Sequence, residues 1–360
     1  MGDGKEAALQ HEIIGYTKSG APFTRTADPG AQWFFNPTLL GLFIHFGIST
    51  VHGDCDISWG MMDNPERRAK GNGIVTPREY WKQAEAFDPR SFEPERWLYA
   101  AKEAGFTYAV FTAKHHDGFA MWPSDAGTLS TKNYQGGRDI VGEYVAACRK
   151  VGLKVGLYYS PPDWYFNQKY MSFMIGSRSE KYPDRPNKDI DHKPIGDLPV
   201  MPEEHYAAYC DYLNRQIKEL MTRYGRIDVL WFDGTVKDTT KFISAEEIRA
   251  MQPGIVINDR LWGVGDYCTQ YECRMPTERP KEKYWEACVI WHVGGGWSYV
   301  KNADKYRPLE LSMSQYDTIK RFGGNFMLNI APDRDGVVPA AYYAAAKELS
   351  DAVKERYGAV

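Results

Sequence analysis

Short, almost continuous apolar runs recur along the chain, and each of them ends in polar or aromatic residues. Runs of this kind are typical of strands that are buried on both faces of a parallel sheet. The pattern therefore predicts a series of buried strands. The runs cover residues 39–47, 108–116, 154–164, 227–234, 254–260, 285–292 and 325–333.

Helical patterns separate these runs. We expect Ser91 to cap one helix, and Ser244 with Glu247 to open another as a capping box. Gly152 is typical of a residue that ends a helix. The predicted helices cover residues 91–106, 142–152, 203–225, 244–254 and 339–356.

Alternating strands and helices are typical of a (β/α) barrel or of a doubly wound sheet. A doubly wound sheet gathers its polar signals at one switch point behind a GxGxxG turn, and the first run, GLFIHFG, has no such turn. Here nearly every run ends in polar or aromatic side chains, which would converge on the C-terminal mouth of a barrel. We therefore predict an α/β fold, an irregular TIM-like (β/α) barrel. The residues at the run ends are His45, His115, His116, Tyr158, Tyr159, Asp233, Asn258, Asp259, Arg260, His292 and Asn329.

One stretch interrupts the predicted barrel. Residues 161–202 are rich in Pro, Asp, Lys and aromatic residues, and we expect one long loop at the C-terminal face of the third strand, close to the site. We expect residues 1–34 to be an N-terminal extension and residues 35–360 to form the catalytic barrel domain, with this loop as an insertion. No C-terminal β-sandwich domain is expected, since the chain stops soon after the last helix.

The composition narrows the function classes. The net charge of −3 does not favour binding to nucleic acid or to an anionic membrane. With 11 Trp and 24 Tyr, the chain can line a cleft suited to sugar rings, or simply have an aromatic core. The six cysteines form no CxxC pair and are expected to be mostly free, although Cys268 and Cys273 could pair. The start has no apolar signal-peptide region, so we expect a cytoplasmic protein, or a periplasmic or secreted one whose signal was removed.

Asp233 ends the buried run VLWFDG. A buried carboxylate is costly unless it is solvated, paired or functional. It could cap the next helix, or it could be a nucleophile beside Gly234, which allows close approach of a ligand. Arg260 could belong to a salt-bridged turn, or its charge could hold Asp233 ionised.

His115 and His116 allow three interpretations. Adjacent residues of a strand point to opposite faces, so the pair can share one metal ion only if the strand ends before it. One core histidine beside one surface histidine is the second interpretation. We favour the third, recognition of hydroxyl groups, because a neutral imidazole both donates and accepts a hydrogen bond. His45 would serve the same cavity, and we expect no metal and no cofactor.

Several motifs together resemble one family. The series GLFIHFG, FTAKHHDGFAMWPS, GLYYSPPDW, LWFDG, NDRLWG, WEACV and GGNFMLNIAPDRDG resembles glycoside hydrolase family 29, the retaining α-L-fucosidases, over about residues 35–345. The KHHDGF and GGN…LN…P…DG stretches are the most specific. The resemblance implies an exo-glycosidase that releases terminal α-L-fucosyl residues from oligosaccharides or glycoconjugates by double displacement.

The resemblance also implies roles for single residues. Asp233 matches the family's nucleophile, and Trp297 matches an aromatic residue that packs against the C5 methyl group of fucose. The other residues matched to sugar binding are His45, Trp59, His115, His116, Tyr158 and Arg260.

Two departures from the family pattern affect the pocket. Ser58 stands where the family often has a glutamate that touches the sugar, although the neighbouring Trp59 is kept. His292 and the glycine run 294–296 are additional residues that we expect to reshape the pocket floor. These changes leave a related α-glycoside, such as an α-L-galactoside, as an alternative substrate. Two other functions are alternatives: an inactive carbohydrate-binding relic and a metal-dependent hydrolase. The chain could also form a homo-oligomer.

The acid/base has three candidates. The segment GDYCTQYECRMP matches a family segment with one extra residue and points to Glu272, with Glu278 and Glu286 as rivals. We expect the pKa of this glutamate to be raised in the free enzyme, while Arg260 keeps Asp233 ionised.

Overall fold

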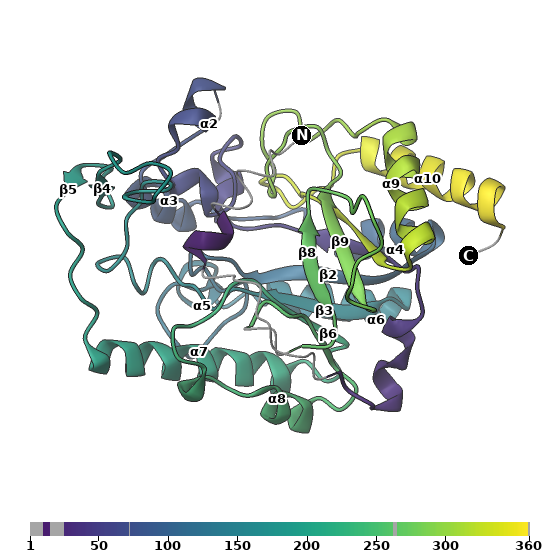
Figure 1. Cartoon of the computed structure of the whole chain (residues 1–360), viewed down its shortest axis with the longest axis horizontal. Coiled ribbons are helices and arrows are strands. Elements are labelled where there is room, and N and C mark those ends of the chain that lie inside the picture. Colours follow the sequence, from purple (N-terminus) through teal and green to yellow (C-terminus); the bar gives the residue numbers. More distant parts are fainter. Residues whose placement is uncertain (1–9, 15–24, 72, 262–264, 359–360) are drawn as a thin grey trace.

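The computed structural model describes residues 10–14, 25–71, 73–261 and 265–358. Its centre is one curled sheet of eight parallel strands in the order β7-β6-β3-β2-β1-β10-β9-β8. The labelled strands β2, β3, β6, β8 and β9 of this sheet cross the middle of Figure 1. The strands are β1 (Leu40–Ile44), β2 (Phe106–Lys114), β3 (Lys154–Tyr159), β6 (Val229–Phe232), β7 (Val256–Ile257), β8 (Cys268–Glu272), β9 (Trp285–Ile290) and β10 (Asn325–Ile330).

The two ends of the sheet are joined. Asn258, directly after β7, forms a parallel bridge with Tyr267, directly before β8. The Asp266 N–H also donates to the Ile257 carbonyl at 2.7 Å. A parallel sheet that curls until its edge strands meet is a TIM-like (β/α) barrel, so the predicted fold class is confirmed.

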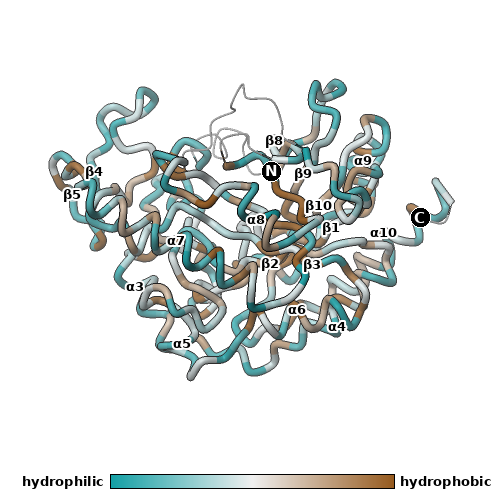
Figure 2. The backbone as a smooth tube through the Cα atoms, turned by 90° about the horizontal axis from the view of Figure 1, so that it is seen from below, coloured by the Kyte–Doolittle hydropathy of each residue, from teal (hydrophilic) through white to brown (hydrophobic). Residues whose placement is uncertain are grey.

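Helices cover the outside of this sheet. Hydrophobic residues concentrate on the central strands in Figure 2, while the outer turns of the helices are mostly hydrophilic. α4 and α6 pack against each other and against β2 and β3, and α10 packs on α4 and α9. The helices are α2 (Pro65–Ala69), α3 (Pro77–Lys82), α4 (Pro94–Glu103), α5 (Thr131–Tyr134), α6 (Ile140–Val151), α7 (Glu203–Arg223), α8 (Ala245–Met251), α9 (Leu309–Phe322) and α10 (Ala341–Tyr357). Short 3₁₀ turns are η1 (Pro29–Phe35), η2 (Ile48–Val51), η3 (Trp59–Met61), η4 (Gln83–Glu85) and η5 (Thr239–Lys241).

The alternation of side chains along β3 separates the inside of the barrel from the outside. The Tyr158 hydroxyl donates to Asp233 at 2.6 Å inside the barrel, whereas the Tyr159 hydroxyl donates to Gln216 of α7 at 2.9 Å. Successive strand residues point to opposite faces, so this two-residue period decides which side chains can reach the mouth.

The seven predicted strands and five predicted helices are all present, with shifted ends. Ser244 and Glu247 form the predicted capping box, and Gly152 ends α6 with a left-handed φ of 82°. The prediction for Ser91 is wrong, because Pro94 fixes the first turn and Glu93 stands at the N-cap. β8 was not predicted, because its sequence, CTQYE, contains no apolar run. α9 was not predicted either.

Residues 161–202 form the expected long connection. Their only strands are the two-residue β4 (Asn187–Lys188) and β5 (Pro194–Ile195), which pair antiparallel and project from one side in Figure 1. Pro162 and Trp164 of this stretch lie beside the barrel mouth. All six cysteines are free, including Cys268 and Cys273. None of the described helices is long and apolar enough to cross a membrane.

Candidate active site

A cavity of about 320 Å³ lies at the C-terminal ends of the strands. Its wall mixes aromatic rings with carboxylates, imidazoles and one guanidinium, a combination suited to a small polar ring. The lining residues are Gln10, His11, Ile14, Phe43, His45, Trp59, His115, Tyr158, Trp231, Asp233, Arg260, Glu272, Cys288 and Trp297.

Asp233 follows the last residue of β6 and is held by two donors. Arg260 Nη1 donates to Oδ1 at 2.7 Å, and the Tyr158 hydroxyl donates to Oδ2 at 2.6 Å. The residue is only 9 % exposed. Both donors fix the carboxylate in one orientation, so the alternative of Asp233 as a helix cap has no support in this geometry. Asp233 therefore has the fixed, partly desolvated position that a nucleophilic carboxylate needs.

Arg260 connects the two candidate carboxylates. Its Nη1 binds Asp233, and its Nη2 donates to Glu272 Oε2 at 2.5 Å. The guanidinium lies over the Trp231 ring at 4.6 Å, and Nε donates to Thr269 Oγ1 at 3.1 Å. A planar guanidinium with several fixed partners cannot swing away from either carboxylate, so Asp233 and Glu272 are brought to the same side of the cavity.

Glu272 ends β8 and has a second partner that the sequence did not predict. His11 Nε2 lies 3.0 Å from Glu272 Oε2 and donates to it, since a carboxylate only accepts. His11 belongs to a short helical turn at residues 10–13, which lies near the centre of Figure 1. The proposed acid/base therefore has two donors on one oxygen, Arg260 and His11.

These contacts reverse the expected protonation pattern. Burial raises the pKa of Asp233, and the Glu272 carboxylate raises it further, while Arg260 opposes both. Burial would also raise the pKa of Glu272, but Arg260 and His11 outweigh it and hold that pKa below its usual range. The expectation of a raised pKa for Glu272 is wrong for this arrangement, because it did not include the contact with Arg260 or the second donor, His11.

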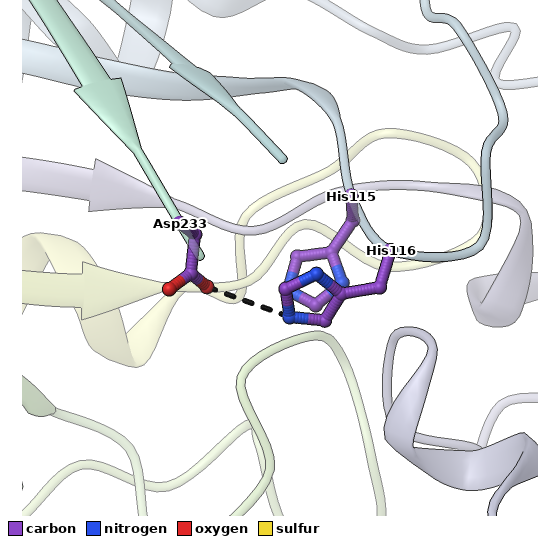
Figure 3. Close-up of side chains that lie close together, drawn as sticks. All are labelled: His115, His116 and Asp233. Carbon is purple, nitrogen blue, oxygen red and sulfur yellow. Dashed lines mark ion pairs between the residues drawn. The ribbon is translucent and has the colours of Figure 1, made fainter. Parts of the chain in front are cut away.

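The two adjacent histidines lie just beyond β2, where the strand alternation no longer applies. Their rings are 4.2 Å apart between centroids, and His115 stacks on Tyr158 at 5.1 Å. His116 Nε2 lies 3.5 Å from Asp233 Oδ2, the contact that is dashed in Figure 3. Burial lowers the pKa of both histidines well below the usual value. Both rings are therefore neutral, and this contact is not a salt bridge.

Hydrogen bonds behind the rings fix what each histidine presents to the cavity. The Ser160 hydroxyl donates to the Pro162 carbonyl at 2.8 Å, so His116 Nδ1, 2.5 Å from Ser160 Oγ, must be the donor there. The Nε2 of His116 then carries no proton and can accept a hydrogen bond. A sugar hydroxyl is a suitable donor for it. His115, His116 and Asp233 could also hold a metal ion, since they offer ligand atoms within 4.8 Å of one another.

Three further predicted residues lie around the same cavity. His45 Nδ1 is 2.6 Å from Asn329 Oδ1, and burial lowers its pKa to about 3. Trp59 lies edge-on to His116 at 5.2 Å. The His45 and Trp297 rings are 5.0 Å apart, so they form one continuous wall.

Ser58 does not occupy the role of the family glutamate. Its hydroxyl lies 2.6 Å from His115 Nδ1 and accepts from the Asp117 N–H at 2.8 Å, behind the histidine. Ser58 is fully buried and is not among the residues that line the cavity. The short side chain thus orients His115 but leaves no acidic group for the sugar at this position.

The additional residues after β9 act on the wall rather than on the pocket floor. His292 is fully buried and does not line the cavity. At Gly296 a Cβ would come within 3.0 Å of Asp56 Oδ1, which accepts from the Trp297 N–H at 2.8 Å. The glycine therefore allows the chain to approach Asp56, which fixes the backbone of Trp297.

The two rival glutamates lie elsewhere. Glu278 is exposed and does not line the cavity. Glu286 is inside the barrel, where it accepts from the Tyr108 hydroxyl and, at 2.9 Å, from Trp231 Nε1. Neither is placed to protonate a leaving group in the cavity.

Glu286 gives a prediction for stability. Burial raises its pKa to about 7, so between about pH 4.5 and 7 the folded chain binds more protons than the unfolded chain. Its contribution to stability is present at low pH and is lost as the pH rises through this window, on the order of 3 kcal/mol in total. We expect Glu286→Gln, which stays neutral, to show a smaller drop in Tm between pH 5 and 8 than the wild type. Equal drops in both proteins would contradict the burial of a titrating carboxyl.

Some lining residues could have been found from the sequence. Phe43 and Trp231 stand two positions before His45 and Asp233, so the period of a strand places them on the same face. His11 had no comparable signal, because nothing in its surroundings indicates a strand end or a known motif.

Comparisons with known proteins all return one kind of protein. A family model described as Alpha-L-fucosidase matches residues 11–356. The tissue alpha-L-fucosidase of Rattus norvegicus is 28 % identical over 332 residues, 86 % of this chain and 65 % of the relative. The alpha-L-fucosidase of Dictyostelium discoideum is 26 % identical over 336 residues, 85 % of this chain and 66 % of the relative. The chain thus spans just under two thirds of the length of these relatives.

Solved structures show the same architecture. Alpha-L-fucosidase isoenzyme 1 from Paenibacillus thiaminolyticus superposes with a TM-score of 0.72 at 29 % identity, over 91 % of this chain and 75 % of that one. A GH29 alpha-L-fucosidase from Bacteroides thetaiotaomicron, described as a trapped covalent intermediate in complex with 2-fluoro-fucosyl fluoride, gives 0.73 at 25 % identity, over 94 % and 77 %.

Proposed function

Because the chain belongs to the alpha-L-fucosidase family, we propose that it hydrolyses terminal α-L-fucosyl residues of fucosylated glycans with retention of configuration. The observation that carries the proposal is the arrangement of Asp233 and Glu272 on one cavity, joined by Arg260. A retaining glycosidase needs two carboxyl groups on one bound sugar, one as nucleophile and one as acid/base. We propose residues 35–360 as the catalytic barrel domain.

The first step forms an ester. The Asp233 carboxylate attacks the anomeric carbon while the bond from this carbon to the leaving oxygen breaks. The reactive state is the one in which Glu272 is protonated, and this proton goes to the leaving oxygen, so the alcohol departs neutral. Arg260 orients the attacking carboxylate by a bond of 2.7 Å, and its positive charge opposes the rise in the Asp233 pKa that burial causes.

The second step reverses the roles. The Glu272 carboxylate takes a proton from a water molecule, whose oxygen attacks the anomeric carbon and displaces Asp233. The fucosyl–enzyme ester breaks, and fucose leaves with its original configuration. The relative from Bacteroides thetaiotaomicron, described as a trapped covalent intermediate, supports this two-step scheme for the present chain.

The sugar is proposed to be held by neutral donors and acceptors and by aromatic rings. His45, His115 and His116 are uncharged, so they can bind hydroxyls without competing with Arg260 for Asp233. Trp297 lines the cavity and offers an apolar face to the C5 methyl group.

One observation supports an alternative substrate. Ser58 is turned behind His115 and supplies no carboxylate to the sugar. A pocket without this charge loses one means of rejecting a sugar with an additional hydroxyl. An α-L-galactoside, which carries a hydroxyl on C6, is therefore the alternative substrate.

The test compares aryl glycosides. We expect release of 4-nitrophenol from the α-L-fucoside, and a kcat/KM about tenfold to 100-fold lower on the α-L-galactoside, since one group in an apolar pocket discriminates by this order. Rates on both glycosides are measured with the purified wild-type chain.

A matched variant sharpens this test. Ser58→Ala keeps the size of the side chain but removes the hydroxyl that orients His115, so it should reduce kcat/KM on both sugars alike. A preference for the galactoside in the wild type would overturn the assignment of fucose. No release from either glycoside would contradict the proposed activity.

A further inference from the structure

Segment 10–14 packs directly on the turn that follows Asp233. Ile14 is 2 % exposed, and its carbonyl accepts from the Thr235 N–H at 3.2 Å. Between them, Gly234 has a φ of 90°, and a Cβ there would come within 2.6 Å of the Ile14 carbonyl oxygen. The fit depends on glycine, so the segment is part of the site and not a loosely lying end.

Segment 10–14 separates two spaces. Gln10, His11 and Ile14 line the cavity that contains Asp233 and Glu272. Glu12, Ile13 and Ile14 line a groove on the other side, together with residues of the 161–202 stretch. A glycan bound with its terminal sugar in the cavity would have to pass this segment to reach the groove.

His11 binds one of the two carboxylate oxygens of Glu272. Glu272 Oε2 is 3.0 Å from His11 Nε2 and 2.5 Å from Arg260 Nη2. With two donors at this oxygen, a leaving alcohol can bind Oε2 only if one of them moves away. Arg260 also binds Asp233 at 2.7 Å, so His11 is the donor that can be displaced. The side chain of His11 is 19 % exposed and that of Glu272 is 9 % exposed, so the imidazole is the group nearer to solvent.

We propose that His11 is a specificity-determining positioning residue, which occupies Glu272 Oε2 in the free enzyme until a sugar leaving group displaces it. The proposal rests on the proposed function. It identifies the favoured substrate as a fucoside whose leaving group is a sugar alcohol able to take over the contact that His11 makes with Glu272. Aryl leaving groups, which depart without a proton, do not need this exchange.

The proposal predicts a change in the pH profile. Other groups also face Glu272 and remain in the variant, so any shift must come from His11. They are Arg260, Asp233, His45, His116, Tyr158, Cys273 and Cys288. Loss of the His11 donor raises the affinity of Glu272 for its proton, and activity on substrates that need the proton then persists to higher pH.

The experiment measures kcat/KM against pH for the wild type and His11→Ala. The substrates are 4-nitrophenyl α-L-fucoside and α-1,2-, α-1,3- and α-1,6-linked fucosyl disaccharides. For at least one disaccharide, the basic limb of the pH profile should move up by about one pH unit. At a pH above the Glu272 pKa of both proteins, kcat/KM of the variant should then be up to about tenfold higher than that of the wild type. On the aryl fucoside the basic limb should stay at its wild-type position, since 4-nitrophenolate departs without a proton.

Two variants serve as controls. His11→Phe keeps a ring in the wall but cannot donate, so it should show the same shift of the basic limb with a smaller gain in rate. His52→Ala removes an exposed histidine that does not line the cavity, and its profile should match the wild type.

The outcomes separate this proposal from the proposed function. A wild type inactive on every fucoside would refute both. An active wild type with an unchanged basic limb in His11→Ala would overturn the role of His11 alone. Equal losses on aryl and disaccharide substrates would also overturn it, since they would make His11 a residue that only supports the fold or binds the sugar.

Discussion

Asp233→Ala is expected to lose at least ~10⁴-fold in kcat on 4-nitrophenyl α-L-fucoside, because no carboxylate remains to form the ester. The loss should affect kcat rather than KM, since the aromatic and imidazole walls of the cavity do not include this side chain. Binding of fucose, measured by calorimetry, should persist. The initial rate and the binding isotherm of the same preparation check both parts.

The structure explains why this variant should still fold. Arg260 keeps its bond of 2.5 Å to Glu272, so removal of Asp233 does not leave the buried guanidinium unpaired. Glu246, an exposed carboxylate on α8, provides a matched control, and Glu246→Ala should keep the wild-type rate. If Asp233→Ala retained more than about one per cent of wild-type kcat, another group would have to be the nucleophile.

Much of the site followed from one property of strands. Residues two apart on a strand share a face, and the ends of parallel strands meet at one mouth. His45, Tyr158 and Asp233 were therefore expected together, and the structure places them around one cavity. The same period includes Phe43 and Trp231, which the analysis of motifs alone passed over.

Two parts of the site could not be predicted from local patterns. β8 carries Glu272, but its polar sequence reads as a loop and becomes a strand only because it pairs with β9. His11 is 261 positions from Glu272 in the chain, and no periodicity connects residues so far apart. Contacts of this kind depend on tertiary packing. The donors to Glu272 could therefore not be predicted, and the expected pKa of Glu272 was wrong for that reason.

Glu272→Ala is expected to separate substrates by their leaving groups. With fucosyl disaccharides, kcat/KM should fall by about 10²–10⁴-fold, because the leaving alcohol receives no proton. With 4-nitrophenyl α-L-fucoside the formation of the ester should be little affected, since 4-nitrophenolate departs without a proton. The measurement is kcat/KM for both substrate types at the same pH.

Azide tests the second step of the same variant. Without Glu272 no group deprotonates the attacking water, so the fucosyl–Asp233 ester should accumulate when the leaving group is good. Azide needs no deprotonation and can enter the space that the side chain leaves, so it should raise kcat and give α-fucosyl azide, the retained product. Glu278→Ala, at the exposed rival, should show neither effect. Equal losses on both substrates, without a response to azide, would move the acid/base role away from Glu272, because a merely structural defect does not distinguish leaving groups.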